Sequence, residues 1–259
     1  MDTARPHPAR VYDYLLGGKD NFAADRDAGD AMIARLPGLP AMTRANRDFL
    51  GRAVRHLVRT HGVRHFLDIG SGIPTSRNVH EIAQAADPGA RVVYVDDDPV
   101  VAAHSRALLT GAEAGRTAFV HADATDPAAV LAAPAVAELL DRAEPVALMV
   151  VSVLMYFPDD TAHRIVDTLL AALPPGSFLT VSHPTADFDP AVVAQAVAAA
   201  RRSGLTYITR TRAEVEAFFA GTDPVEPGVV PLLAWRPDGG TAPPDPHGVY
   251  YWAGMARRR

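Results

Sequence analysis

Cysteine is absent from this chain of 259 residues, which excludes disulfides, thiolate metal ligands and thiol catalysis. A surplus of basic residues is absent as well, and the formal net charge of -5 leaves no electrostatic footprint for nucleic acid. The longest apolar run, VALMVVSVLMYF at residues 146–157, is shorter than the roughly 20 residues of a membrane span and is typical of a buried strand. The first residues also lack the charged, apolar and small-residue succession of a signal peptide. We therefore expect a cytoplasmic protein without a nucleic-acid or membrane partner, whose oligomeric state the composition leaves open.

From residue 64 onward, short β-branched runs alternate with longer alanine-rich stretches. The stretches have helical spacing and predict helices over residues 76–86, 99–109, 127–141 and 159–173. The runs are almost continuously apolar, as expected for parallel strands that are covered by helices on both faces. They read RHFLDIG, ARVVYVDDD, TAFVHADAT, PVALMVVSVL and GSFLTVSHP. This alternation predicts a doubly wound α/β fold.

The two ends of the chain extend the pattern. Residues 28–61 predict helices that are interrupted at LPGLP, and residues 189–203 predict another alanine-rich helix. A capping box at Thr211 and Glu214 predicts the start of a further short helix. VVPLLAW and GVYYWAGMA, near the end of the chain, predict two more strands.

Near the beginning, the segment HPARVYDYLLGGKDNF contains Gly17, Gly18 and Lys19, which suggests a phosphate-binding loop. Such a loop needs a glycine where this chain has Asp13 and a Ser or Thr where it has Asp20, and two carboxylates would repel a phosphate. The segment is nevertheless too rich in apolar side chains for a disordered tail. These side chains are Val11, Tyr12, Leu15 and Leu16. We therefore expect the segment to dock on the rest of the protein.

The strongest local signal is FLDIGSGIPTSRN, a strand that runs into a Gly70-Ser71-Gly72 turn and then into a helix. In a parallel sheet this turn lies at the carboxyl edge, where ligands bind. Glycines there allow a ligand to approach the backbone, and the next helix offers free N–H groups. A dinucleotide fingerprint would have its third small residue at Thr75, but here Pro74 precedes it and has no N–H for a pyrophosphate. The turn favours an adenosine ligand without a diphosphate over NAD.

Carboxylates follow the strands at the same edge of the predicted sheet. Asp68 ends the first strand, Asp96 ends the second, and Asp123 with Ala124 follows the third. An acidic residue at the end of the second strand can accept hydrogen bonds from a ribose diol, and we assign this role to Asp96. Asp123 could accept a hydrogen bond from an adenine amino group. The residues at all three strand ends therefore favour an adenosine site.

These residues together resemble the Rossmann-like, class I methyltransferases that depend on S-adenosylmethionine. Four segments more narrowly resemble an actinobacterial family, formerly a domain of unknown function, that is called S-adenosyl methyltransferase. The segments are RVYDYLLGGKDNFAADR, FLDIGSGIPT, VVYVDDDP and VEPGVVPLLAWRP. The resemblance implies a seven-stranded, mostly parallel sheet with helices on both faces and an antiparallel last strand. With the ligand site at the carboxyl edge of the sheet, the segment that carries Tyr12, Tyr14 and the Gly17-Gly18 hinge is suited to fold over that edge as a lid. We therefore expect an N-terminal lid and helical extension over residues 1–61 and a methyltransferase domain over residues 62–259.

The same resemblance implies S-adenosylmethionine as the cofactor and a division of roles around it. Asp68 and the glycine turn would hold the methionine moiety, Asp96 the ribose, and Asp123 with Ala124 the adenine. In the lid, Tyr14 could pack on the adenine or lie near the sulfonium. The predicted cofactor-binding residues are thus Tyr14, Asp68, Gly70, Ser71, Gly72, Asp96, Asp97, Asp123, Ala124 and Ser152. The general motif often has a third glycine where this chain has Pro74, a departure that the narrower family shares.

The sequence assigns no catalytic residue, and no metal is expected, because His104, His121 and His163 lack metal-ligand spacing. His183, in VSHPT, is a candidate general base, with a structural histidine as the alternative. Tyr156, in SVLMYFPD, is a candidate for orienting a substrate hydroxyl, with simple packing as the alternative. That stretch also lacks the Asn-Pro-Pro-Tyr type of motif associated with amino-group methylation of bases and glutamine.

Three functions follow from these features. The first is methyl transfer to oxygen, nitrogen or carbon of a small organic acceptor. The second is a regulatory protein that binds S-adenosylmethionine without turnover, since no catalytic residue is obvious. The third is an NAD(P)-dependent oxidoreductase, which the glycine turn and the acidic strand end would also suit.

Overall fold

The computed structural model describes residues 2–75, 77–109, 117–140, 143–241, 243 and 245–259. Its strands form one sheet in the order β3-β2-β1-β4-β5-β8-β6, and β7 pairs with β8 beside this path. The strands are β1 His65–Ile69, β2 Arg91–Asp96, β3 Thr117–His121, β4 Val146–Val151, β5 Phe178–Pro184, β6 Thr222–Pro224, β7 Val230–Pro231 and β8 Tyr251–Arg258. The first five pair in parallel, whereas β8 pairs antiparallel with β5. The predicted Rossmann-like α/β fold is confirmed, although the sheet has eight strands instead of the expected seven.

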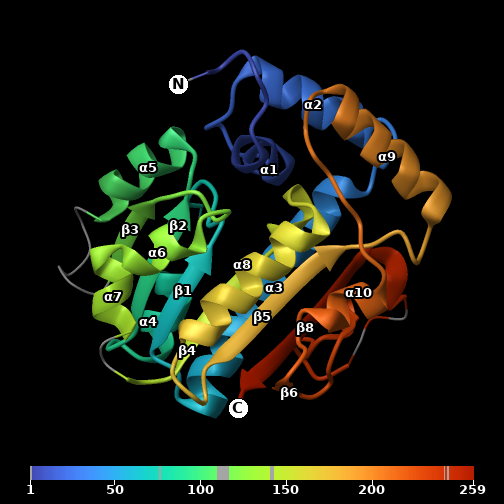
Figure 1. The fold of residues 1–259 in the computed structure, drawn as a ribbon. Helices are drawn as coiled ribbons and strands as arrows, with labels where there is room; N and C mark the ends of the chain where they lie inside the picture. The colour runs from blue at the N-terminus through green and yellow to red at the C-terminus, as the bar shows by residue number, and fades with distance from the viewer. Residues whose placement is uncertain (1, 76, 110–116, 141–142, 242, 244) are drawn as a thin grey trace.

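Helices cover both faces of the sheet (Figure 1). The helices are α1 Pro8–Leu16, α2 Ala23–Ile33, α3 Leu39–His61, α4 Val79–Ala86, α5 Pro99–Leu109, α6 Pro127–Ala132, α7 Pro134–Leu140, α8 Asp159–Ala172, α9 Pro190–Arg202 and α10 Arg212–Ala217. One hydrophobic core contains side chains of α1 to α4 and α9, and the other contains side chains of α6, α7, α8 and α10. The described helices include none that is both long and apolar enough to cross a membrane.

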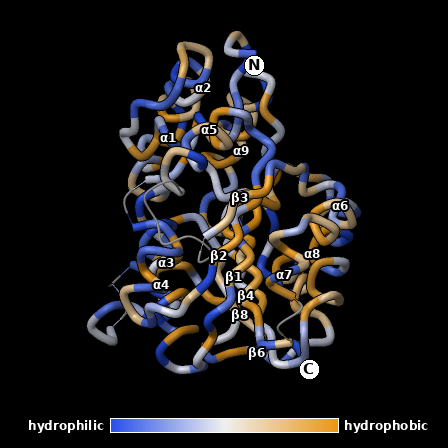
Figure 2. The backbone as a smooth tube through the Cα atoms, turned by 90° about the vertical axis from the view of Figure 1, so that its left-hand side faces the viewer, coloured by the Kyte–Doolittle hydropathy of each residue, from blue (hydrophilic) through white to orange (hydrophobic). Residues whose placement is uncertain are grey.

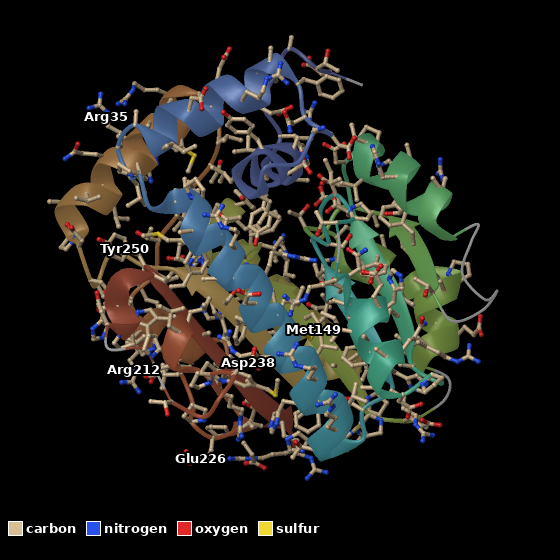
Figure 3. The ribbon with its side chains drawn as sticks, turned by 180° about the vertical axis from the view of Figure 1, so that it is seen from behind. Arg35, Met149, Arg212, Glu226, Asp238 and Tyr250 are labelled. Carbon is tan, nitrogen blue, oxygen red and sulfur yellow. The ribbon has the colours of Figure 1, made fainter. Side chains whose placement is uncertain are left out.

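Alternate residues of the central strands enter these two cores, which explains why the runs are apolar throughout. Phe66 of β1 and Met149 of β4 face the α3 side, while Leu67 and Leu148 face the α8 side. Figure 2 shows the strands as a largely hydrophobic layer in the middle of the molecule. Figure 3 shows α3 lying along its face of the sheet, next to Met149. Burial on both faces therefore stabilises the parallel arrangement.

The N-terminal helices lie above the carboxyl ends of the parallel strands (Figure 1). The predicted interruption at LPGLP is present, because α2 ends at Ile33 and α3 begins at Leu39. Val11 and Leu15 of α1 and Met32 of α2 belong to the same core as the sheet. The docking expected for the N-terminal segment is therefore observed, and α1 to α3 share one core with the strands.

Three local predictions need correction. The helix expected over residues 127–141 is two helices, because Pro134 starts a new one and cannot continue the first. The helix expected over 76–86 begins at Val79, where Asn78 and Glu81 form a capping box; residues 76 and 141 lie outside the described part. VVPLLAW forms a strand only at Val230–Pro231 and then turns into a 3-10 helix at Leu232–Ala234.

The last of these differences has a tertiary cause. The buried Trp235 ring packs edge-on against Phe49 of α3, with ring centroids 5.2 Å apart. Arg52, also on α3, donates hydrogen bonds to the carbonyl oxygens of Trp235 and Leu232 at 3.0 and 2.9 Å. The segment therefore leaves the sheet in order to pack against α3.

Candidate cofactor and active site

A pocket of about 170 Å³ opens at the carboxyl ends of β1, β2 and β4. This is the place where the strand order reverses on either side of β1, and ligands of open α/β sheets bind at such points. Helices α1 and α3 supply the remaining wall. The lining residues are His7, Pro8, Ala9, Tyr12, Asn46, Arg47, Leu50, Asp68, Gly70, Ser71, Gly72, Asp96, Asp97, Val151, Ser152, Val153, Tyr156 and Phe157.

The turn after β1 requires its glycines. Gly70 and Gly72 have φ angles of +65° and +68°, a region that other residues adopt only with strain. A Cβ at Gly70 would collide with the Val153 side chain, whereas a Cβ at Gly72 would have no other atom within 4 Å. Between them, the buried Ser71 hydroxyl oxygen has no hydrogen-bond partner among the described residues. The turn thus combines open space with an unused polar group, as a ligand site would.

This contrast predicts different outcomes for two matched substitutions. Gly70→Ala adds a clash to the backbone strain, so we expect a loss of about 3 kcal/mol in the free energy of unfolding. Gly72→Ala adds only the strain, roughly 1 kcal/mol, but places a methyl group in the pocket. Thermal unfolding of both variants measures this difference. Equal melting temperatures for the two variants would contradict the proposed collision with Val153.

Two buried carboxylates face the pocket from the ends of β1 and β2. Burial raises the pKa of Asp68 to about 7, although Arg47 lowers it; the nearby Asp96 adds to the increase. Burial likewise raises the pKa of Asp96 to about 6. The backbone N–H groups of Asp98 and Gly72 donate hydrogen bonds to the Asp96 carboxylate at 3.0 and 2.8 Å and partly oppose this increase. Within the described part of the chain, the Asp68 carboxylate accepts no hydrogen bond. Its negative charge would therefore be stabilised by a cationic ligand.

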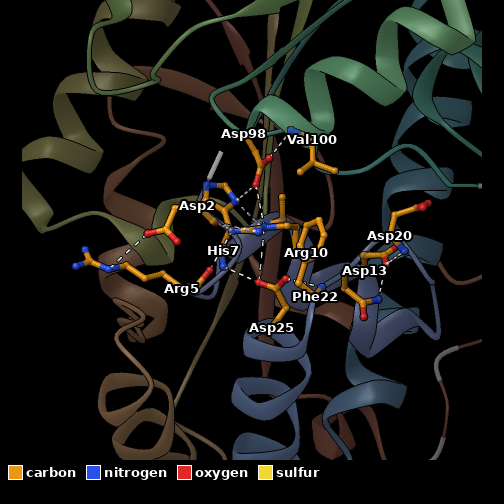
Figure 4. A network of polar contacts seen from close by, with 12 residues as sticks. Asp2, Arg5, His7, Arg10, Asp13, Asp20, Phe22, Asp25, Asp98 and Val100 are labelled. Carbon is orange, nitrogen blue, oxygen red and sulfur yellow. Dashed lines mark hydrogen bonds and ion pairs between the residues drawn. The ribbon is translucent and has the colours of Figure 1, made fainter.

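The N-terminal segment is tied to the end of β2 by a group of charged residues that we call the clasp: His7, Arg10, Asp25, Asp97 and Asp98. Figure 4 shows His7, Arg10, Asp25 and Asp98 of this group. His7 Nδ1 lies 2.8 Å from Asp98 Oδ2, and its Nε2 lies 3.6 Å from Asp97 Oδ1. Arg10 Nε lies between two carboxylates, 3.2 Å from Asp98 and 3.6 Å from Asp25. The clasp therefore holds α1 against the pocket.

The charge state of His7 follows from these contacts. Burial alone would lower its pKa, but hydrogen bonds and charges from Asp97 and Asp98 outweigh burial and raise the pKa to about 9. The imidazole is therefore a cation at neutral pH and donates to Asp98. The hydrogen bond from His7 also lowers the pKa of Asp97, which keeps this pocket-lining carboxylate ionised.

Polar groups also line the end of the pocket beside β4 and α3. Asn46 joins Tyr12 to β5, because its Nδ2 donates to the Tyr12 hydroxyl at 2.9 Å and its Oδ1 accepts from Ser182 at 2.6 Å. Ser152 has a φ of +58°, and its hydroxyl lies 3.1 Å from the Tyr251 hydroxyl. Such strain in a residue other than glycine is frequent at functional sites.

Four residues of the sequence-based site lie outside the pocket lining. The exposed Asp123 carboxylate accepts a hydrogen bond from the Thr125 N–H at 2.8 Å, and Ala124 packs against the core on the α8 side. Tyr14 donates to Asp30 Oδ1 at 2.6 Å and does not face the pocket. An adenine-binding role for Asp123, Ala124 and Tyr14 stays a prediction. All the other predicted cofactor-binding residues line the pocket.

The fourth residue, His183, is completely buried and bonded on both ring nitrogens. Its Nδ1–H donates to the Pro184 carbonyl at 2.8 Å, and its Nε2 accepts from Arg210 at 2.7 Å. Burial, together with Arg210, lowers the pKa of His183 to about 3, so the ring is neutral. These contacts favour a structural role for His183, which does not line the pocket, and its role as a general base stays a prediction.

Arg210 is the centre of these contacts. Its guanidinium also donates to the carbonyl oxygens of Leu154 and Phe157 and to Asp159, at 2.7 to 3.1 Å. It thereby fixes the loop after β4, which supplies Tyr156 and Phe157 to the pocket. Sequence reasoning missed Arg210 and also missed His7, Arg10, Asn46 and Arg47. For His7 and Arg10, the available signals were Pro8, which is typical of a helix start, and the apolar residues of the same segment.

The comparisons with known proteins agree on one family. A family model described as S-adenosyl methyltransferase matches residues 1–259. The chain belongs to the S-adenosyl methyltransferase family. Over its whole length it is similar to a crystal structure of a DUF574 family protein from Streptomyces avermitilis, with 46% identity, a TM-score of 0.94 and 99% of that chain covered. It is also similar to a candidate methyltransferase from Thermobifida fusca, with 41% identity, a TM-score of 0.92, and 100% and 97% of the two chains covered.

A curated relative is a candidate S-adenosyl-L-methionine-dependent methyltransferase of Mycobacterium tuberculosis. It is 32% identical over 170 residues, which are 59% of this chain and 50% of the relative. The chain thus spans about half the length of the curated relatives it matches. The family resemblance read from the sequence is confirmed, and the cofactor of the family is S-adenosylmethionine.

The residues present fit this cofactor. Its ammonium and ribose hydroxyls are donors, and the pocket offers acceptors in Asp68, Asp96 and Asp97. Its carboxylate needs a cation or donors, which Arg47 and the Ser71 hydroxyl can supply. The open side of Gly72 leaves room for close approach. This balance of charges favours S-adenosylmethionine over the NAD(P) ligand considered from the sequence.

A pH dependence of cofactor affinity follows from the two raised carboxyl pKa values. A proton on Asp68 or Asp96 must leave before the carboxylate can bind a cationic ligand, so affinity should increase as pH rises through about 6 and 7. We expect binding at pH 6 to be about tenfold weaker than at pH 8, measured by calorimetry. An affinity that stays constant or falls over this range would show that neither carboxylate takes part.

Proposed function

We propose that the protein transfers a methyl group from S-adenosylmethionine to oxygen, nitrogen or carbon of a small organic acceptor. The observation that carries the proposal is the arrangement of the pocket. Carboxylates and a glycine turn lie on its β1 and β2 side, and an aromatic wall of Tyr156 and Phe157 lies on its β4 side. The first side suits the cofactor, and the second leaves a separate surface for an acceptor.

Around the cofactor, we assign Asp68 to the amino group, the turn at Gly70, Ser71 and Gly72 to the rest of the methionine moiety, and Asp96 with Asp97 to the ribose diol. Asp123 and Ala124, at the end of β3, remain our assignment for adenine. When bound, the sulfonium of the cofactor would supply an electrophilic methyl group to an acceptor that lies against Tyr156 and Phe157. The protein therefore needs mainly to align the acceptor and exclude water.

The second candidate, a regulator that binds the cofactor without turnover, is favoured by the position of His183. Both of its ring nitrogens have hydrogen-bond partners, which disfavours a role as a general base. Methyl transfer does not require a base, so this observation does not decide between the two.

Binding and turnover separate the candidates. Calorimetry with S-adenosylmethionine, S-adenosylhomocysteine and NADH should give binding of the first two compounds only. Release of S-adenosylhomocysteine in the presence of a metabolite extract should then exceed its release with the cofactor alone. Binding without any turnover above this background would support the regulator, and binding of NADH alone would overturn both candidates.

A further inference from the structure

Two further cavities lie next to the cofactor pocket and share lining residues with it or with each other. The first shares Pro8, Tyr12 and Tyr156 with the pocket, and the second shares Met32, Leu39, Tyr207 and Tyr251 with the first. Together we call them the inner cavity. Its walls are helices α1, α2, α3 and α9, the ends of β5 and β8, and the loops beside them. It is lined by Pro8, Val11, Tyr12, Leu15, Met32, Leu36, Leu39, Met42, Thr43, Met155, Tyr156, Pro184, Thr185, Val193, Ala196, Val197, Leu205, Tyr207, Tyr250 and Tyr251.

The walls of the inner cavity differ in charge from those of the cofactor pocket. No Asp, Glu, Lys, Arg or His is among its lining residues, whereas the pocket has Asp68, Asp96, Asp97, Arg47 and His7. Transferring an ion from water into such surroundings is costly unless it finds a partner. An occupant of the inner cavity should therefore be uncharged and largely apolar.

The polar atoms that remain are mainly tyrosine hydroxyls. Tyr12 bonds to Asn46, while Tyr251 bonds to Ser152 and Tyr207. The Tyr156 hydroxyl has no hydrogen bond in the described part of the chain, and Tyr156 lines both the pocket and the inner cavity. Burial raises the pKa of all these phenols, so they stay protonated and can donate a hydrogen bond. Tyr156 is thus a free donor at the junction of the two spaces.

The inner cavity can adapt its size. Each of its two parts measures about 20 Å³, enough for roughly one water molecule. Met32 and Met155 line it, and methionine side chains are unbranched and change rotamer easily. A molecule of one ring could enter when these two side chains turn aside, and a larger one would have to displace α1.

We infer that the inner cavity is the acceptor site, and that the acceptor is a small, uncharged, mostly apolar molecule whose polar end accepts a hydrogen bond from Tyr156. The inference rests on the proposed methyl transfer. The polar end of the bound acceptor then lies at the mouth of the cofactor pocket, and its apolar part lies among the side chains of α1 to α3. Because these helices cover the site, water is excluded from it.

Three probes with the same ring and different charge test this inference: para-cresol, para-toluate and para-methylbenzylammonium. Their binding to the protein saturated with S-adenosylhomocysteine is measured by saturation-transfer NMR and titration. We expect the uncharged cresol to bind at least tenfold more tightly than either ion. Equal or tighter binding of an ion, or no binding of any probe, would overturn the inference.

Substitutions in the inner cavity, with one control outside it, test where the probe binds. Leu205→Phe fills the inner cavity and should abolish cresol binding while changing S-adenosylhomocysteine affinity by less than twofold. Leu170→Phe, at a similarly buried leucine on the opposite face of the sheet, is the matched control. It should bind cresol and S-adenosylhomocysteine as the wild type does. Tyr156→Phe should weaken cresol binding about fivefold. Unchanged cresol binding in Leu205→Phe would contradict the location, whereas absence of S-adenosylhomocysteine binding to the wild type would instead reject the proposed function.

Discussion

Replacing Asp68 by Asn is expected to weaken S-adenosylmethionine binding about thirtyfold while making the free protein more stable at pH 8. The loss of affinity follows because a buried carboxylate that accepts from an ammonium contributes about 2 kcal/mol more than a neutral amide in its place. The gain in stability follows because this carboxylate is buried without a hydrogen bond among the described residues and has a pKa raised to about 7. Function and stability thus oppose each other at this residue.

The effect of Asp68 on stability depends on pH. In the unfolded chain the pKa of Asp68 is near 3.8, so between pH 4 and 7 the folded protein binds a proton that the unfolded protein has lost. Its free energy of unfolding therefore falls as pH rises through this window, and the full cost of the charge is reached above pH 7. An asparagine side chain at this position carries no such cost. The melting temperature of Asp68→Asn should exceed that of the wild type by about 5 °C at pH 8 and by clearly less at pH 5.

Asp167→Asn, at an exposed position of α8, is the control, and it should change neither affinity nor melting temperature. Calorimetry and thermal unfolding of the three proteins at both pH values make the comparison. If Asp68→Asn bound the cofactor as tightly as the wild type does, the assignment of Asp68 to the amino group would have to be abandoned.

Replacing Arg10 by Met should strongly destabilise the fold. Arg10, Asp25 and Asp98 are all nearly inaccessible to solvent, with exposed fractions of 4%, 0% and 2%. Removing the guanidinium leaves the buried Asp98 carboxylate paired with the His7 imidazole, and it leaves the buried Asp25 carboxylate with hydrogen bonds from the backbone N–H groups of His7 and Phe22. Breaking a buried ion pair on one side costs about 3 kcal/mol, which lowers the melting temperature by roughly 8 °C.

The same substitution should loosen α1 and so weaken S-adenosylmethionine binding, because His7, Pro8 and Ala9 form part of the pocket wall. Arg5→Met is the matched control: Arg5 pairs with Asp2 at 3.7 Å, but both side chains are exposed, and such pairs contribute little. Arg10→Lys keeps the positive charge, so its melting temperature should lie between those of Arg10→Met and Arg5→Met. A melting temperature for Arg10→Met equal to that of Arg5→Met would show that the clasp does not stabilise the fold.

Most of the residues that line the pocket at the strand ends could be predicted from the sequence. The glycine turn, Asp68, Asp96, Asp97, Ser152 and Tyr156 were placed at one edge of a parallel sheet, and all of them line one pocket. They were found because the carboxyl ends of parallel strands meet at one edge, which needs only strand identity and direction. His183 satisfied the same rule at the end of β5, yet its side chain points into the core toward Arg210. Strand position locates a residue, but it does not determine which of the two faces its side chain enters.

The N-terminal segment shows the same division. Its apolar residues predicted that it would dock, and its tyrosines and Gly17-Gly18 hinge suggested a lid over the predicted ligand site. Which residues reach the cofactor pocket was not predictable, because Tyr12 faces the pocket while Tyr14, two positions later, bonds to Asp30 on the surface. Their directions depend on the rotation of α1, which packing of Val11 and Leu15 against the core decides.

By itself, the sequence determined the alternation of strands and helices, the glycine turn at residues 70–72, the edge of the sheet at which the carboxylates gather, and the family. These follow from local patterns of a few residues, in which each side chain constrains its own backbone. Only the tertiary structure decided the clasp between His7 or Arg10 and Asp98, the raised pKa of Asp68, the role of Arg210 and the uncharged inner cavity. Such features join residues that are far apart along the chain, and their energies depend on burial, which exists only once the chain has folded.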